Sequence, residues 1–179
     1  GNVVISDVRH VEEIEAVSII DICRRAGIEV VTAGVEDKVL IGAHSIKIEM
    51  DKRVDEVKSS DFDMIVLPGG LPNAFTLADD NDVQRLLKEF EEKNKKIGAI
   101  CAAPYALHKA GVLNQNYTCY PSFEKKIKDD GYQDDKNVVT DNNVITSRGP
   151  ATAIDFALEI VKTLKGDDIY FQVKTGLLA

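Results

Sequence analysis

The sequence predicts an α/β fold in which a mostly parallel, doubly wound sheet carries helices on both faces. Short apolar segments, typical of buried parallel strands, alternate along the chain with longer segments of helical periodicity. Glycine or proline stands at several of the boundaries between them. The chain has 179 residues and contains no repeat and no Pro/Gly/Ser-rich linker. We therefore expect one domain over residues 1–179.

The sequence of the first half of the chain predicts four strands and two helices. Apolar residues recur at i, i+3, i+4 and i+7 from Ala16 to Cys23, which gives the first helix one buried face, and Gly27 ends it. The fourth strand is apolar throughout and runs into Pro68-Gly69-Gly70. In chain order, the predicted strands are residues 3–5, 28–32, 46–48 and 64–67, and the predicted helices are residues 12–26 and 82–94.

The second half continues the alternation and ends in a hairpin and a long helix. Asp141-Asn142-Asn143 separates two apolar segments and suits a hairpin turn, because these residues tolerate left-handed backbone. Gly149-Pro150 begins the last helix, and Gly166 ends it. The predicted strands are residues 97–100, 117–120, 138–140 and 144–146, a short helix covers residues 104–110, and residues 122–136 form a surface loop or short helix.

The composition excludes several classes of protein. Lys and Arg number 22 against 30 Asp and Glu, a net charge of −8 with no dense basic block, so nucleic-acid binding is not expected. No apolar run is long enough to cross a membrane, and the N-terminus has no signal-type pattern. The three cysteines form neither a metal-type spacing nor a disulfide framework. We expect a cytoplasmic protein with no metal site and no membrane partner.

Cys101 is the residue that carries most chemical information. It follows an apolar strand segment, and Pro104 comes three residues later, where it suits the first turn of a helix. Cys101 is therefore expected on a sharp strand-to-helix turn, where a nucleophile elbow places its nucleophile. Backbone N–H groups at the helix start would lower the pKa of the thiol. The alternative, a small core cysteine at a strand end, stays open at this point.

Five segments together resemble a known family. In chain order they are Glu12-Glu13-Ile14-Glu15-Ala16-Val17, Arg24-Arg25-Ala26-Gly27-Ile28, Leu67-Pro68-Gly69-Gly70, Ala99-Ile100-Cys101-Ala102-Ala103-Pro104 and Thr146-Ser147-Arg148-Gly149-Pro150. Their order and spacing resemble the ThiJ/PfpI superfamily, in the branch that holds the DJ-one and ThiJ-like proteins. The resemblance runs from Val3 to about Val173.

The resemblance implies a flavodoxin-like fold, a homodimer, no cofactor and a defined set of site residues. Cys101 would be the nucleophile, and Glu15 the carboxyl group that hydrogen-bonds to its sulfur. Gly70 and Ala102 would present N–H groups to an oxyanion, with Gly69 in the same turn. A carboxylate beside a thiolate is a like-charge pair, so Glu15 should stay protonated and exchange a proton with substrate. Glu15 as an ordinary solvated helix residue is the alternative.

Two positions depart from the family pattern. His10 stands in the loop before the first helix, where relatives have glycine, and could supply a group that titrates near pH 7, although an exposed loop histidine is the simpler interpretation. Tyr120 stands where relatives often have histidine, and tyrosine is a poor base. Ala102 follows the cysteine directly, where peptidase-like relatives place histidine, so a protease is not expected.

Two functions follow as hypotheses. The first is a cysteine-dependent, cofactor-independent glyoxalase or deglycase acting on small reactive dicarbonyls such as methylglyoxal, with Cys101 as nucleophile and Glu15 as general acid/base. The second is an oxidative-stress sensor or protective protein that uses an oxidisable Cys101 with little catalysis. Either function uses the same sulfur.

Overall fold

A computed structural model describes all residues from Gly1 to Ala179. Its centre is a seven-stranded sheet in the order β5-β2-β1-β6-β7-β9-β8, in which only the β8–β9 pair is antiparallel. A separate two-stranded hairpin pairs β3 with β4. The strands are β1 (Asn2–Asp7), β2 (Glu29–Gly34), β3 (Val39–Ile41), β4 (Lys47–Glu49), β5 (Lys52–Arg53), β6 (Met64–Leu67), β7 (Lys96–Ile100), β8 (Val138–Asp141) and β9 (Val144–Ser147).

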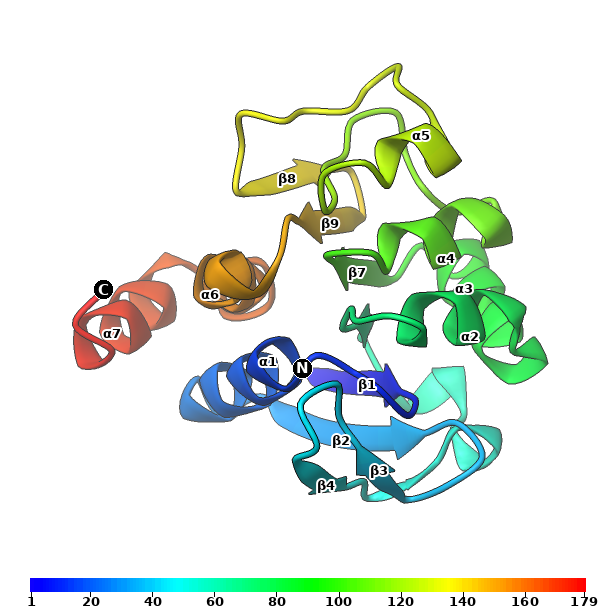
Figure 1. The fold of residues 1–179 in the computed structure, drawn as a ribbon. Coiled ribbons are helices and arrows are strands. Elements are labelled where there is room, and N and C mark those ends of the chain that lie inside the picture. The colour runs from blue at the N-terminus through cyan, green and yellow to red at the C-terminus, as the bar shows by residue number, and fades with distance from the viewer.

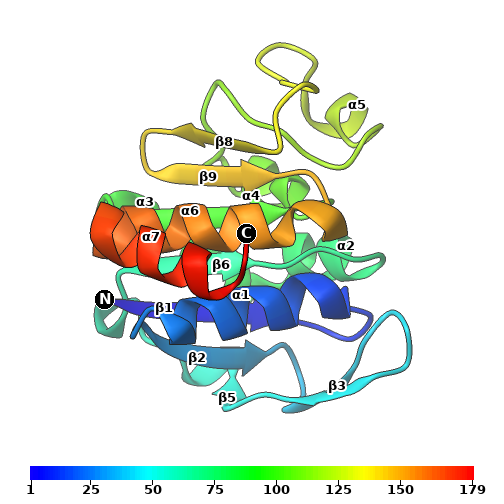
Figure 2. The ribbon, with the colours of Figure 1, turned by 90° about the vertical axis from the view of Figure 1, so that its left-hand side faces the viewer.

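Helices cover both faces of the sheet (Figures 1 and 2). On one face lie α1 (Glu13–Arg25), α6 (Ala153–Lys165) and α7 (Asp167–Gly176), and on the other lie α2 (Asn73–Asp79), α3 (Asn81–Glu92) and α4 (Pro104–Ala110). The short helix α5 (Glu124–Ile127) lies beyond β8 and β9 at one end of the molecule. Three single-turn 3₁₀ helices cover Val54–Glu56, Ser59–Asp61 and Pro150–Thr152.

The side chains of each strand alternate between two cores. On β1, Val4 packs with the α3 and α4 side, whereas Val3 and Ile5 pack with the α1 and α6 side. The same alternation continues on β6, where Ile65 and Met64 enter opposite cores. The predicted fold class, a mostly parallel doubly wound sheet with helices on both faces, is therefore confirmed. None of the helices combines the length and apolar character that a membrane crossing requires.

Most predicted elements are present within a few residues, but several differ, and the short strand β5 was not predicted. The predicted edge strand at residues 46–48 belongs to the β3–β4 hairpin rather than to the main sheet, and β3 was not predicted. Helices α2 and α7 were also missed, so the helix after Gly149-Pro150 is not the last. The predicted strand at residues 117–120 was wrong: it makes only one isolated bridge, from Tyr117 to Tyr132.

The parallel order places the chemistry at one edge of the sheet. The carboxyl ends of β1, β6 and β7 are adjacent, because β1 pairs with β6 and β6 pairs with β7. The loops that leave these strands contain His10, Gly69-Gly70 and Cys101. Open α/β sheets bind ligands outside the carboxyl ends of their strands, so this edge is the place to look for a site.

Candidate active site

Cys101 lies on the expected turn between β7 and α4. Its backbone is held by two hydrogen bonds: its N–H donates to Ser147 O at 3.0 Å, and its carbonyl accepts from Tyr120 N at 2.8 Å. Its φ is +66°, in the left-handed region that non-glycine residues rarely adopt. Such backbone strain is typical of functional turns that the surrounding structure holds in place. The residue is buried, with 9% of its surface accessible.

Helix α1 brings Glu15 to the same point. Glu15 is fully buried, one turn inside the helix, and its Oε1 accepts a hydrogen bond from Gly69 N at 2.8 Å. Its carboxyl group also lies beside Cys101, because a Cβ at Gly69 would meet both groups, and each of the two residues shifts the pKa of the other. The other oxygen, Oε2, is buried and has no hydrogen-bond partner. Glu15 is therefore not the solvated residue that the alternative interpretation required.

The backbone N–H groups of Gly70 and Ala102 lie next to the Cys101 sulfur, and each acts to lower the pKa of the thiol. A Cβ at Gly70 would lie 2.6 Å from the His10 carbonyl oxygen, and φ there is +110°, so only glycine suits the position. A Cβ at Gly69 would lie 2.5 Å from the Cβ of Cys101. The two glycines thus let the loop after β6 approach the sulfur closely enough to point an N–H group at it.

The protonation of Cys101 and Glu15 is coupled. Burial raises the pKa of Glu15 to about 7. Burial, and next the negative charge of an ionised Glu15, also raise the pKa of Cys101, although the Ala102 and Gly70 N–H groups oppose this. The N–H group of Ala102 at the helix start acts to lower the pKa of this thiol, as predicted, but burial outweighs it, so the predicted net decrease was wrong. When Glu15 holds the proton, its charge no longer opposes a thiolate, so one proton is shared by the pair.

The two residues that depart from the family pattern lie at the edge of the site. His10 is half-buried with φ of +72°, and its side chain makes no hydrogen bond, although its carbonyl contacts the Gly70 turn. Tyr120 is 48% exposed and is joined to Cys101 through its backbone. The structure therefore places both residues near Cys101 without giving either side chain a polar role.

Sequence reasoning missed Asn73, which fixes the loop around Gly69. Its side-chain nitrogen donates to the carbonyls of Pro68 and Gly69 at 2.9 and 3.1 Å, and its oxygen accepts from Val8 N at 3.0 Å. The residue is fully buried. No local pattern marks it, because its three partners belong to two loops that meet only in the folded chain.

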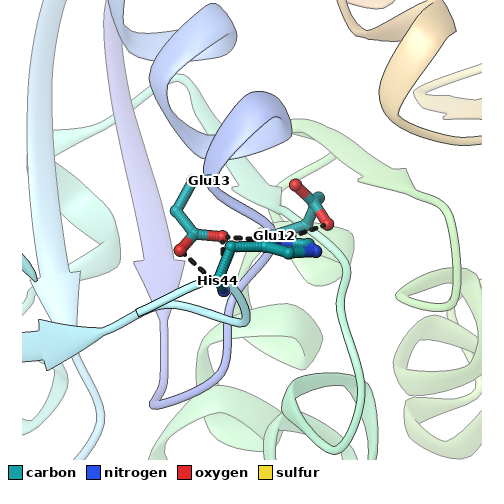
Figure 3. Close-up of side chains that lie close together, drawn as sticks. All are labelled: Glu12, Glu13 and His44. Carbon is teal, nitrogen blue, oxygen red and sulfur yellow. Dashed lines mark hydrogen bonds and ion pairs between the residues drawn. The ribbon is translucent and has the colours of Figure 1, made fainter. Parts of the chain in front are cut away.

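A second group that the sequence did not reveal lies beside this site. Glu12 and Glu13 lie at the start of α1, and His44, from the β3–β4 turn, contacts both (Figure 3).

Cys23 and Cys119 are buried in separate packing clusters, as expected of structural cysteines. Burial raises the pKa of Cys23 to about 12, and burial with the charge of Glu124 does the same for Cys119.

Comparison with known proteins decides the family. Residues 2–163 match the model of the DJ-1/PfpI family. The chain belongs to the DJ-1/PfpI family. It is 41% identical over 170 residues to protein dj-1beta of Drosophila melanogaster, a match that covers 93% of this chain and 91% of that protein. It is 39% identical over 158 residues to the glutathione-independent glyoxalase DJR-1.2 of Caenorhabditis elegans, which covers 88% of this chain and 84% of the relative.

Solved structures of the family have the same fold. The crystal structure of Drosophila melanogaster DJ-1beta superposes with a TM-score of 0.95 at 38% identity, covering 99% of this chain and 97% of that one. An oxidized form of Toxoplasma gondii DJ-1 gives a TM-score of 0.94 at 35% identity over the same shares of the two chains. The resemblance to this family that the sequence motifs indicated is confirmed.

Proposed function

We propose that this protein is a cysteine-dependent, cofactor-independent glyoxalase or deglycase that acts on small reactive dicarbonyls such as methylglyoxal. The observation that carries the proposal is the convergence of three groups on one sulfur: the N–H groups of Gly70 and Ala102 and the carboxyl group of Glu15. A glyoxalase among the relatives, the C. elegans protein, supports the same activity class. The small accessible fraction of Cys101 favours a compact substrate.

The first step forms a carbon–sulfur bond. The sulfur of Cys101 attacks the aldehyde carbon, and the proton shared with Glu15 neutralises the resulting oxyanion, giving a hemithioacetal. Until that proton arrives, the Gly70 and Ala102 N–H groups can stabilise the negative oxygen, which develops within reach of the same donors that now face the sulfur. A group whose pKa is about 7 suits proton transfer in both directions near neutral pH.

The second step moves hydrogen between neighbouring carbons. Glu15 removes the proton from the former aldehyde carbon and returns it to the adjacent carbon, while the hydroxyl proton passes from the first oxygen to the second. The product is an α-hydroxy thioester on Cys101. Water then cleaves the carbon–sulfur bond, which releases a hydroxy acid such as lactate and restores the thiol. One molecule of dicarbonyl and one of water yield one hydroxy acid, so no external oxidant, reductant or cofactor takes part.

The decisive experiment compares turnover of methylglyoxal by three forms of the protein. We expect Cys101→Ser to lose essentially all activity and Glu15→Gln to lose about 10²–10⁴-fold, the range typical of a general acid/base. Cys119→Ser, which removes a buried cysteine outside the site, is the matched control and should keep wild-type turnover. Wild-type turnover equal to that of Cys101→Ser would reject the proposal.

A second candidate function, an oxidation sensor, uses the same sulfur. It is favoured by the donor arrangement, because the Gly70 and Ala102 N–H groups and a protonated Glu15 would hold a sulfinate as well as an alkoxide. Mild peroxide followed by peptide mass analysis tests it. A selective gain of two oxygens on Cys101 without dicarbonyl turnover would favour the sensor, whereas equal oxidation of all three cysteines would exclude it.

We also propose that the chain works as a homodimer in the cytoplasm. Large apolar side chains are exposed on α1, on the β3–β4 turn and on α6, which packs against α1, and a large contiguous apolar surface is rare on a monomer. They are Ile14 (57% exposed), Val17 (48%), Ile46 (55%) and Ile154 (45%). Ile14 and Ile46 line one hollow together, which supports a continuous patch. A second copy of this chain is the partner that would bury it.

A further inference from the structure

We infer that Glu12, Glu13 and His44 form a binding site for one divalent late first-row metal ion of the Zn²⁺ type. The site lies beside the candidate active site but contains none of its residues. One ligand atom from each of the three side chains lies within 4.8 Å of the others. Figure 3 shows the two carboxylates and the imidazole ring pointing toward a common region.

The distances suit a tetrahedral ion. Nδ1 of His44 lies 3.2 Å from Oε1 of Glu13 and 3.7 Å from Oε2 of Glu12. Ligand atoms that each lie about 2.1 Å from a tetrahedral ion are roughly 3.4 Å from one another. An ion bound to Nδ1 would therefore need only small side-chain adjustments to reach the two carboxylate oxygens as well.

The charges favour a cation at this point. Only 13% of the Glu12 side chain and 6% of the Glu13 side chain are accessible, and neither carboxylate pairs with a lysine or arginine. Their one ion-pair partner is His44. Two buried carboxylates this close repel each other, and an ion between them would remove the repulsion.

Glu13 is fixed in place before any ion arrives. Its carboxylate accepts hydrogen bonds from the backbone N–H groups of His44 and Ile46, the shortest at 2.8 Å. These bonds, together with one from its own N–H, lower its pKa although burial acts in the opposite direction, so the group stays ionised. Gly42 packs against it so closely that a Cβ there would lie 2.4 Å from the Glu13 carboxyl carbon. Backbone donors that orient a ligand are the usual support of a metal site.

The site is reachable from solvent and has room for a further ligand. In the single chain the His44 side chain is 71% exposed, so an ion can reach the ring before the proposed dimer covers Ile14 and Ile46. A hollow of about 530 Å³ adjoins the cluster, lined by Glu12, Glu13, Ile14, His44, Ile46 and Pro150. Two carboxylates and one imidazole leave one tetrahedral position for water or a small anion, the arrangement found in catalytic rather than structural zinc sites.

Titration of the chelator-treated protein with Co²⁺ tests the site, because tetrahedral Co²⁺ absorbs visible light strongly. Calorimetric titration with Zn²⁺ then gives the number of ions bound per chain. We expect one ion per chain, and at least a tenfold loss of affinity in His44→Ala and in Glu12→Gln. His108→Ala, which removes an exposed histidine elsewhere, and Cys101→Ser should bind as the wild type does. Circular dichroism checks folding, and His44→Gln replaces His44→Ala if the latter unfolds.

The outcomes separate this site from the proposed enzyme. Three outcomes would each overturn the assignment. The first is retained affinity in both His44 variants, the second is loss of affinity in His108→Ala or Cys101→Ser, and the third is that the wild type binds neither ion. The readouts are metal absorption and heat, not turnover. A failure of the dicarbonyl assay would therefore leave this result unchanged, and the reverse also holds.

Discussion

The backbone N–H of Gly69 donates to Oε1 of Glu15 over 2.8 Å, which ties the loop after β6 to the acid on α1. The neighbouring Gly70 N–H lies next to the Cys101 sulfur and acts to lower the pKa of the thiol. One turn of chain therefore positions both the acid and the sulfur. The relative placement of the two groups depends on this turn more than on either helix.

Gly69→Ala is expected to inactivate the protein without unfolding it. The added Cβ would lie 2.5 Å from the Cys101 Cβ and 2.8 Å from Glu15 Oε1, so the turn must move by several tenths of an ångström or more. We expect turnover of methylglyoxal to fall at least about 100-fold, the loss that misplacement on this scale can cause. Gly176→Ala, with nothing within 4 Å of the new carbon, is the matched control. Undiminished turnover in Gly69→Ala would show that the turn does not position the pair.

The alkylation rate of Cys101 is expected to rise with pH around pH 7. Burial raises the pKa of Glu15 to about 7, and loss of the first proton from the Cys101–Glu15 pair creates either a thiolate or a carboxylate base beside the thiol. Iodoacetamide labelling followed by peptide mass analysis gives the profile. Glu15→Gln has no proton to lose at this position, so its profile should lack the step near pH 7. An identical profile in the two proteins would contradict the coupling.

Asp7 is expected to make the protein less stable as pH rises from about 4 to 7. It is fully buried, both side-chain oxygens lack hydrogen-bond partners, and burial raises its pKa to about 7 from 3.8. Between about pH 4 and pH 7 the folded state keeps a proton that the unfolded chain releases. The free energy of unfolding therefore falls as the pH rises through this range. A shift of about three pH units corresponds to roughly 4 kcal/mol.

Asp7→Asn isolates this effect, because the amide keeps the shape and cannot ionise. At pH 8 we expect the variant to be more stable than the wild type by about 2–4 kcal/mol in urea unfolding, with a smaller difference at pH 4. Asp135→Asn, on an exposed loop, is the control and should change little. A stability difference that does not depend on pH would refute the assignment to Asp7 ionisation.

The apolar patch of Ile14, Val17, Ile46 and Ile154 is expected to hold two chains together. A lysine at position 14 would bury a charge at the centre of the patch, so Ile14→Lys should sediment as a monomer at micromolar concentration while the wild type sediments as a dimer. Phe171→Lys alters an equally exposed apolar residue on α7 and should leave the dimer intact. A monomeric wild type would remove the dimer proposal.

The order of elements and the turn at Cys101 were predictable because they depend on local patterns. Strand periodicity placed β1, β6 and β7, and Pro104 marked the start of α4 correctly. That Glu15 would lie next to Cys101 was predicted from the family resemblance. The spacing of the two residues in the sequence does not predict it. The structure brings together Glu15, Cys101, Gly69, Gly70 and Ala102, while their roles remain predictions for the experiments above.

The remaining features depend on contacts between distant parts of the chain. The segment 117–120 has strand-like residues, but Thr118 N donates to the Thr146 hydroxyl and Tyr120 N to the Cys101 carbonyl, so no ladder forms. Glu13 and His44 are 31 residues apart and meet only because the β3–β4 turn folds over the start of α1. Asp7 looks like a strand-end residue in the sequence, and only the packed helices around it reveal that it has no partner.

The left-handed backbone at Cys101 has a consequence for thermal resistance. A non-glycine residue held in this conformation lowers the stability of the native state by about 1 kcal/mol or more. Glycine adopts the same conformation without that penalty, so a chain with Cys101→Gly would gain back part of the loss and melt at a higher temperature while having no nucleophile. Selection for heat tolerance alone would therefore act against the cysteine at this turn.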